Sequence, residues 1–197
     1  MKVLAFSDLH LARSRAADLV AASAQADLVI GAGDFCNMRR GLDDAMAMLA
    51  DLAAPMVMVP GNNESTSELR AAAPANADVL HGETLEIGGV TIFGIGGGIP
   101  VTPFGAWSFD LTETEAEALL AGADGADVLV THSPPKGIAD RTSTGLSVGS
   151  TAVRAAIERV QPRLTLCGHI HDCWGQEGRI GASRVHNLGP TVNWFEI

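Results

Sequence analysis

The chain is poor in cysteine, and this argues against a fold stabilised by disulfides. The 197 residues include three cysteines, Cys36, Cys167 and Cys173. An odd number without paired spacing does not form a disulfide framework. Because unpaired cysteine is among the most often buried residue types, we interpret all three as reduced, buried thiols. Metal binding by one of them is the weaker alternative.

Long apolar runs are missing as well. No stretch of about 18 consecutive apolar residues occurs, so neither a membrane-spanning helix nor a membrane partner is expected. The first apolar run, Val3–Phe6, leads directly into polar residues at Ser7 and Asp8. This leaves no room for a cleavable signal peptide, so the expected location is the cytoplasm.

Basic residues are scarce relative to acidic ones. Lys and Arg total 13 against 23 Asp and Glu, which gives a formal net charge of −10. Such a surface repels phosphate backbones, so a nucleic-acid polymer is not expected as a partner. A small anionic substrate is compatible with this charge if cations within the site reverse the local field. The sequence does not indicate an oligomeric state.

The residues that are present follow the pattern of a globular α/β protein. Hydrophobic residues make up 47% and charged residues 18%, which is typical of a folded domain. Short apolar runs predict buried strands at Val3–Phe6, Leu28–Ile30, Met56–Val59, Val128–Val130 and Leu164–Leu166. Amphipathic stretches between them predict helices over about 41–53, from Ser65, from Thr112 and over about 150–160.

The rest of the chain adds β structure. Residues 79–95 alternate in polarity around Gly88–Gly89, which predicts a hairpin, and residues 173–197 predict further short strands separated by glycines. An early βαβαβ pattern followed by a β-rich tail predicts an α/β fold, a two-sheet mixed β-sandwich flanked by helices in the layer order αββα. Neither a repeat nor a low-complexity linker interrupts it, so we expect one domain over residues 1–197.

Each of the five predicted strands is followed at once by a polar cluster. Ligand sites of open α/β sheets form beyond the carboxyl ends of strands, so these clusters are expected to converge in space. They hold four of the six histidines; His81 and His186 lie outside them and receive no role. The clusters are Asp8–His10, Gly33–Asp34, Gly61–Asn62, Thr131–His132 and Gly168–His171.

The donor types in these clusters predict a metal site. Imidazole nitrogen combined with carboxylate oxygen suits Mn, Fe or Zn rather than Ca or Mg alone. Seven donors are too many for one tetrahedral zinc, so we predict two divalent transition metal ions that share a bridging ligand. A single Gly-Asp pair or histidine is weak evidence, and the prediction depends on the ordered set. The predicted ligands are Asp8, His10, Asp34, Asn62, His132, His169 and His171.

This ordered set resembles the motifs of the calcineurin-like metallophosphoesterase superfamily, over nearly the whole chain. Three segments further resemble the small MPPED-type phosphodiesterases: Thr131–Pro135, Val160–Arg163 and Gly168–Asp172. The resemblance implies the calcineurin-like phosphoesterase fold and hydrolysis of phosphate esters by a hydroxide that bridges two metals. It implies that Asp8, His10 and His171 hold one metal, that Asn62, His132 and His169 hold the other, and that Asp34 bridges them.

Two positions depart from the family pattern. The Gly-Asn-His-Glu/Asp motif reads here as Gly61–Glu64, with Asn63 in place of the histidine that protonates the leaving group. The second aspartate of Gly-Asp-x-x-Asp is Asn37. A missing general acid costs about 10²–10⁴ in rate for a poor leaving group, and less for an aryl or cyclic ester. We therefore predict a phosphodiesterase for cyclic nucleotides or aryl esters, with His10 a candidate to replace the acid in part.

Several residues near the motifs are candidates for substrate contact. Asn62 and Asn63 are expected to touch the phosphate. A glycine-rich loop at 94–100, followed by Phe104, Trp107 and Phe109, either stacks a base or covers an edge of the core. Four basic residues either touch phosphate or stay solvated: Arg39, Arg40, Lys136 and Arg141. We interpret Glu64 and Asp172 as supports beside the ligands.

Two other classes of function stay open. One is a non-catalytic binding or scaffold module on the same fold, like the retromer subunit that resembles these enzymes. All seven ligand positions hold competent donors, which favours the enzyme. The other is a nuclease of the DNA-repair kind, which the acidic charge, the short chain and the lack of a capping domain disfavour. The expected partner is a small phosphate ester, with nucleotides among the candidates.

Overall fold

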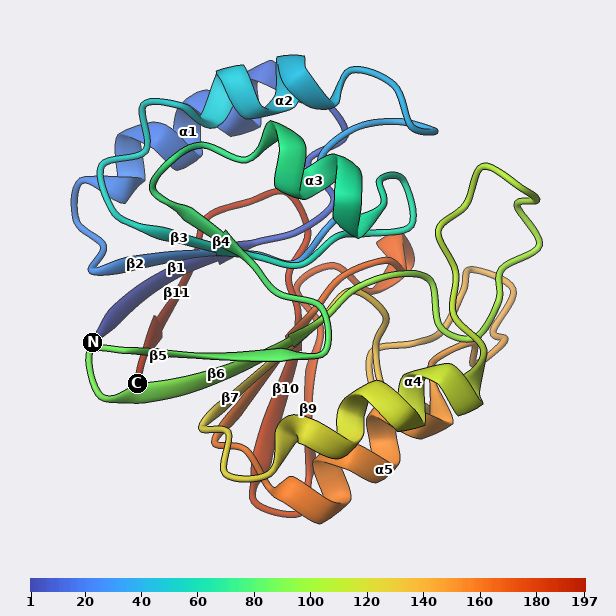
Figure 1. The fold of residues 1–197 in the computed structure, drawn as a ribbon. Helices are drawn as coiled ribbons and strands as arrows, with labels where there is room; N and C mark the ends of the chain where they lie inside the picture. The colour runs from blue at the N-terminus through green and yellow to red at the C-terminus, as the bar shows by residue number, and fades with distance from the viewer.

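Two β-sheets lie face to face between two layers of helices in the computed structural model, which describes residues 1–197 (Figure 1). The first sheet has the strand order β11-β1-β2-β3-β4, and the second has the order β5-β6-β7-β8-β10-β9. Both sheets mix parallel and antiparallel pairs. The predicted fold class, a two-sheet mixed sandwich flanked by helices, is confirmed.

The first sheet is built on four parallel strands, of which β1, β2 and β3 were predicted from their apolar runs and β4 was not. It pairs β1 (Lys2–Phe6), β2 (Leu28–Gly31), β3 (Met56–Met58) and β4 (Ala77–Val79) in parallel. The last strand, β11 (Asn193–Glu196), returns to lie antiparallel beside β1. This return brings the two termini together, and the Met1 amino group donates to the Ile197 carbonyl at 2.7 Å (Figure 1).

The second sheet carries the predicted hairpin at one edge. Strands β5 (Glu83–Ile87) and β6 (Val90–Ile95) pair antiparallel around Gly88–Gly89. Strands β7 (Val128–Thr131), β8 (Leu164–Cys167) and β10 (Ser183–Asn187) continue the sheet in parallel with β6. The edge strand β9 (Glu177–Ile180) pairs antiparallel with β10.

Helices cover the outer face of each sheet (Figure 1). On the first sheet lie α1 (Arg13–Ser23), α2 (Leu42–Leu49) and α3 (Thr66–Ala72); on the second lie α4 (Glu113–Leu120) and α5 (Thr151–Val160). Two short 3₁₀ helices, η1 (Ala121–Ala123) and η2 (His171–Cys173), follow α4 and β8. Ser65 and Thr112, where helices were predicted to begin, each form a capping box at the start of α3 and α4. No helix of this chain has the length and apolar character that crossing a membrane requires.

Alternating side chains build three apolar layers. Val3 and Ala5 of β1 face the second sheet, whereas Leu4 and Phe6 face α1–α3. A third layer lies between the second sheet and the helices α4 and α5. The three cysteines are free and buried, as predicted. With both sheets fixed in this way, the loops that follow β1, β2, β3, β7 and β8 are left to carry polar residues.

Candidate metal centre

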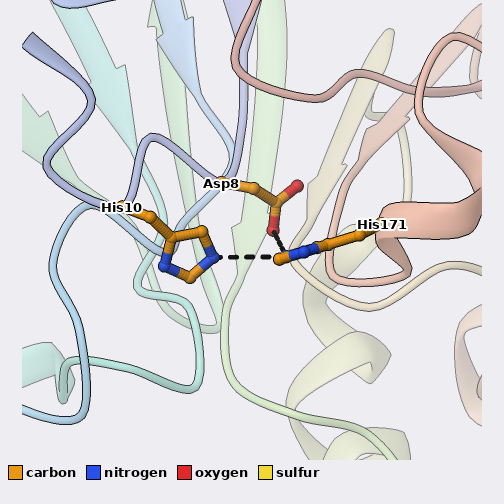
Figure 2. A group of neighbouring side chains, drawn as sticks. All are labelled: Asp8, His10 and His171. Carbon is orange, nitrogen blue, oxygen red and sulfur yellow. Dashed lines mark hydrogen bonds and ion pairs between the residues drawn. The ribbon is translucent and has the colours of Figure 1, made fainter.

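Asp8, His10 and His171 form the first of two sets of side chains that could hold a metal ion (Figure 2). One ligand atom from each lies within 4.8 Å of those of the other two. The Nε2 atoms of His10 and His171 are 3.2 Å apart, and Asp8 Oδ1 lies 3.7 Å from His171 Nε2. Asp8 and His10 follow β1 and His171 follows β8, so the predicted convergence of distant loops occurs here.

Hydrogen bonds determine which nitrogen of His10 faces this set. Its Nδ1 lies 3.1 Å from the Cys36 carbonyl oxygen and 2.8 Å from Asn37 Oδ1, and both of these oxygens accept. Nδ1 therefore carries the proton, and the lone pair of the neutral ring is on Nε2. A lone pair turned toward a carboxylate and a second imidazole is the arrangement that a divalent cation fits.

Asp34, His132 and His169 form the second set, with one ligand atom of each within 4.8 Å of the others. His132 Nδ1 donates to the Ala32 carbonyl at 2.8 Å, which leaves Nε2 as the free nitrogen. That nitrogen lies 3.3 Å from Asn62 Oδ1 and 3.5 Å from Asp34 Oδ1. Three electron-pair donors thus converge on one small volume, and a cation satisfies all three.

The carboxylate of Asp34 lies between the two sets. Its Oδ2 is 3.6 Å from His10 Nε2, and its Oδ1 is 3.5 Å from His132 Nε2. Asn63 holds both oxygens, because its backbone N–H donates to Oδ1 at 2.8 Å and its side-chain amide donates to Oδ2 at 2.7 Å. Each oxygen of one buried carboxylate is therefore directed at a different set.

Charges in this buried cluster support one another. Burial opposes ionisation of Asp34, but the neighbouring histidines, His132 above all, together outweigh it and hold the pKa of this carboxyl below its usual range. Burial likewise lowers the pKa of His132, yet Asp34 raises it to about 9. Burial and the charge of His132 lower the pKa of His169 to about 4. Without metal, the site thus keeps Asp34 ionised, His169 neutral and His132 protonated, so a metal that binds at Nε2 of His132 must displace its proton.

A short relay orients the remaining predicted ligand, Asn62. Its Nδ2 donates to Ser108 Oγ at 3.1 Å, and Ser108 Oγ in turn donates to Asp110 Oδ1 at 2.7 Å. Because the amide nitrogen is directed at Ser108, the carbonyl oxygen of Asn62 faces His132. No sequence signal pointed to Ser108 or Asp110, and Ser108 lies 46 residues away from Asn62 in the chain.

The backbone at the site is strained, which is an independent sign of function. Left-handed φ angles cost about 1–3 kcal/mol at residues other than glycine, and they cluster at active sites. Glycines allow the closest approaches, since a Cβ on Gly61 or Gly168 would collide with Asp34 or with Ser7 and Asp8. Four predicted ligands have positive φ: Asp8 at 53°, His10 at 45°, Asp34 at 60° and His169 at 67°.

Glu64 ties together the loops that carry Asp34 and Asn62. It is fully buried, and its Oε1 accepts from the N–H groups of Asp34 at 2.8 Å and of Gly61 at 2.7 Å. Its Oε2 accepts from Phe35 N at 3.2 Å. Burial and the nearby charge of Asp34 raise the pKa of Glu64 to about 7. The interpretation of this residue as a support beside the ligands matches these contacts.

A cavity of about 360 Å³ opens onto both sets. Of the aromatic candidates, Phe104 and Trp107 line it, whereas Phe109 packs against His81 with ring centroids 5.5 Å apart. None of the four basic candidates lines it. The cavity is lined by His10, Asp34, Asn62, Asn63, Phe104, Trp107, Thr142, His169, Ile170, His171 and Asp172.

Trp174 is a site residue that was not predicted. Its indole N–H donates to Asp8 Oδ2 at 3.0 Å, and its ring packs against His171 with centroids 4.4 Å apart. One side chain therefore positions two of the three members of the first set. The sequence offers no signal for this contact, because Asp8 and Trp174 are 166 residues apart.

We expect Trp174→Phe to weaken divalent metal binding at the first set by about tenfold or more, the usual cost of losing a hydrogen bond to a ligand. Phenylalanine keeps an aromatic ring beside His171 but cannot donate to Asp8. Calorimetric titration of the metal-free protein with Mn²⁺ measures the change. Trp194→Phe is the matched control, since Trp194 lies on β11 outside the cavity. Equal affinities in both variants would contradict the positioning role.

Comparison with known proteins agrees with this geometry. The family model described as calcineurin-like phosphoesterase matches residues 1–173. The chain belongs to the calcineurin-like phosphoesterase family. This family typically uses two divalent metals, and the two donor sets of this calcineurin-like chain match that number.

One relative of this calcineurin-like phosphoesterase is human metallophosphoesterase domain-containing protein 1. It is 32% identical over 143 residues, which cover 70% of this chain and 41% of the human protein. The chain thus spans less than half the length of the curated relatives it matches. This similarity agrees with the MPPED-type resemblance of the motifs.

Solved structures of similar fold include proteins from a bacterium and a fish. TT1561 of Thermus thermophilus superposes with a TM-score of 0.74 at 18% identity, covering 98% of this chain and 97% of that one. A dimetal phosphatase from Danio rerio superposes with a TM-score of 0.65 at 15% identity, covering 96% and 88%. At these identities the likeness establishes the calcineurin-like phosphoesterase fold.

Proposed function

We propose that this chain, acting as one domain over residues 1–197, hydrolyses phosphodiesters with an aryl or cyclic ester group. The observation that carries the proposal is the Asp34 carboxylate, whose two oxygens face two separate sets of metal-binding side chains. The seven predicted ligands would hold two ions of Mn, Fe or Zn. When bound, such ions supply Lewis-acid activation of water and neutralise charge on the phosphoryl oxygens.

Hydrogen bonds from neighbouring side chains position the predicted ligands of this centre. Asn37 accepts from His10, and Asn63 donates to Asp34. Asn62 uses one amide hydrogen on Ser108, so its second amide hydrogen is left for a phosphoryl oxygen. With Nδ1 of His10 already donating and Nε2 turned into the first set, we assign His10 to metal binding rather than to protonating the leaving group.

The lining of the cavity supports a diester over an alkyl monoester. Asn63 replaces the family histidine that protonates the leaving group, and Asn37 replaces the second aspartate of the Gly-Asp-x-x-Asp motif. Both are amides, which cannot protonate a leaving group. No lysine lines the cavity, and its three histidines, His10, His169 and His171, all belong to the two sets. A leaving group that departs without protonation avoids the loss of about 10²–10⁴ in rate that a missing acid causes.

A screen of phosphate esters on the metal-reconstituted protein tests the proposal. With saturating Mn²⁺, bis-p-nitrophenyl phosphate and 2′,3′-cyclic nucleotides are expected to turn over at least about 10² times faster than alkyl monoesters such as glycerol phosphate. Mononucleotides and 3′,5′-cyclic nucleotides complete the set. The Asp34→Asn variant, purified in the same way, reports any contaminating phosphatase.

Two outcomes would count against the proposal in different ways. Faster turnover of alkyl monoesters would remove the diester preference and leave a general phosphomonoesterase. A purified protein without transition metal, with no gain in melting temperature on adding Mn²⁺, would favour the scaffold alternative, since binding to the native state raises stability.

A further inference from the structure

A stacked pair of aromatic side chains forms one wall of the cavity. The rings of Phe104 and Trp107 are nearly parallel, at 12°, with centroids 5.7 Å apart. Phe104 is 51% exposed and its ring lies 6.5 Å from that of His169, a member of the second set. A solvent-exposed phenyl ring beside polar metal-binding groups is the usual composition of a ligand pocket, in which an apolar surface accompanies a few convergent polar groups.

Hydrogen bonds hold this wall in a fixed place relative to the donor sets. Asp110 Oδ2 accepts from the backbone N–H of Thr102 at 2.9 Å and from its hydroxyl at 2.7 Å, which closes the loop that carries Phe104 and Trp107. The backbone N–H of Phe109 donates to the backbone carbonyl of Asn62 at 2.9 Å. The loop that carries Phe104 and Trp107 is thus joined to Asn62, a predicted metal ligand. A substrate that contacts both the aromatic pair and the donor sets therefore meets a preorganised surface.

The charge of the cavity limits what the wall can receive. No lysine or arginine lines the cavity, and Asp172 adds a negative charge at its edge. Arg39 is paired with Glu68 at 2.6 Å, and Arg141 donates to the Gly145 carbonyl at 2.9 Å. Arg40 lines a neighbouring cavity with Trp107. Within the cavity itself, positive charge comes only from cations bound at the donor sets, so a second anionic group on the substrate would have no partner there.

We infer that the substrate is a phosphate ester with a single phosphoryl group and a neutral, planar aromatic substituent, which packs on the exposed face of Phe104. The inference rests on the proposed function, because it takes the two donor sets as the place of the phosphoryl group. It admits aryl esters and mononucleotide-type esters with an uncharged base, and it disfavours diphosphates, triphosphates and bisphosphates.

Binding of phosphonates, whose carbon–phosphorus bond is not hydrolysed, tests this in the Mn²⁺-loaded protein. Phenylphosphonate and cyclohexylphosphonate differ in planarity at similar size, and 4-carboxyphenylphosphonate adds a charge. By calorimetry, phenylphosphonate is expected to bind about three- to tenfold tighter than cyclohexylphosphonate, the contribution of one aromatic contact. The carboxylate should weaken binding relative to phenylphosphonate.

Two substitutions of Phe104 distinguish the contribution of its aromatic ring from that of its apolar surface. Phe104→Leu is expected to remove the preference for phenyl over cyclohexyl, and Phe104→Ala should weaken both. Phe104 is exposed on a loop, so neither change removes a core contact. Trp194→Ala is the matched control, because Trp194 is 39% exposed but lies outside the cavity.

The outcomes distinguish this inference from the proposed function. Equal binding of the phenyl and cyclohexyl compounds, or no effect of Phe104→Ala, would overturn the aromatic wall even while diesters are still hydrolysed. Tight phenylphosphonate binding that depends on Phe104, in a protein that hydrolyses no ester with any metal, would support the wall and reject the enzyme.

Discussion

Replacing Asp34 with asparagine is expected to abolish both catalysis and paired metal binding. One carboxylate faces His10 at 3.6 Å and His132 at 3.5 Å, so its charge serves both donor sets. Asparagine keeps the size of the side chain but loses its charge. Its NH₂ group would also face the side-chain NH₂ of Asn63, which now donates to Asp34, so two donors would meet. Charge stabilisation by metals is worth several kcal/mol, so kcat/KM should fall by about 10³ or more.

Two measurements on this variant check the result together. One is hydrolysis of bis-p-nitrophenyl phosphate with Mn²⁺, and the other is the metal content per chain by atomic emission. Asp18→Asn on α1 is the matched control, since it makes the same change at an exposed position. An Asp34→Asn protein that keeps two metals per chain and loses less than about tenfold in rate would contradict the bridging role.

The positions of the predicted ligands could be read from the sequence because two local signals coincide. Each apolar run is a buried strand, and each donor follows within a few residues of its end. His132, for example, comes directly after β7, and Asp34 follows β2 by three residues. Parallel strands place their carboxyl ends together, so local positions become a spatial prediction.

Helix α1 shows where local signals were too weak. Alanines dilute its apolar face, and no side chain caps its start at Ala12. The helix nevertheless buries Ala16 and Leu19 against the first sheet. Its stability comes from tertiary packing rather than from a periodic pattern or a cap, so the sequence alone did not predict it.

The contacts that hold the ligands could not be predicted, because they join segments far apart in the chain. Trp174 reaches Asp8 across 166 residues, and Ser108 reaches Asn62 across 46. Nearness in sequence was also misleading, since Arg39 lies near Asp34 in the chain but pairs with Glu68 outside the cavity. Such contacts depend on how loops pack, which residue spacing does not encode.

Asn63 illustrates a difference between a motif and its geometry. Judged from the family motif alone, Asn63 is only the loss of the histidine that protonates the leaving group. In the structure its amide donates to Asp34 Oδ2, and its carbonyl oxygen accepts from Met38 N at 2.7 Å. The amide thus joins the loop after β2 to the loop after β3 through the carboxylate itself. The departure from the family therefore comes with a positioning contact at the metal centre.

Glu64→Ala is expected to destabilise the metal-free protein by about 3–5 kcal/mol. Alanine would leave the buried N–H groups of Asp34, Gly61 and Phe35 without their acceptor, and each such group costs about 1–3 kcal/mol. Part of this loss is offset, because burial and Asp34 make the Glu64 charge itself unfavourable and raise its pKa to about 7. The melting temperature should fall by about 10 °C.

Thermal and denaturant unfolding at pH 8 in a metal chelator measure this loss. Glu64→Gln should cost less, because its carbonyl oxygen can still accept from Asp34 and Gly61, while the longer bonds from Phe35 and Cys36 to Oε2 are lost. Glu68→Ala, which removes a partly exposed capping residue, should cost about 1 kcal/mol. If Glu64→Ala were no worse than Glu68→Ala, the two ligand loops would not depend on this carboxylate. If it is worse, the gain in stability on adding Mn²⁺ should also shrink, because the loops of Asp34 and Asn62 would no longer be held together before the metal binds.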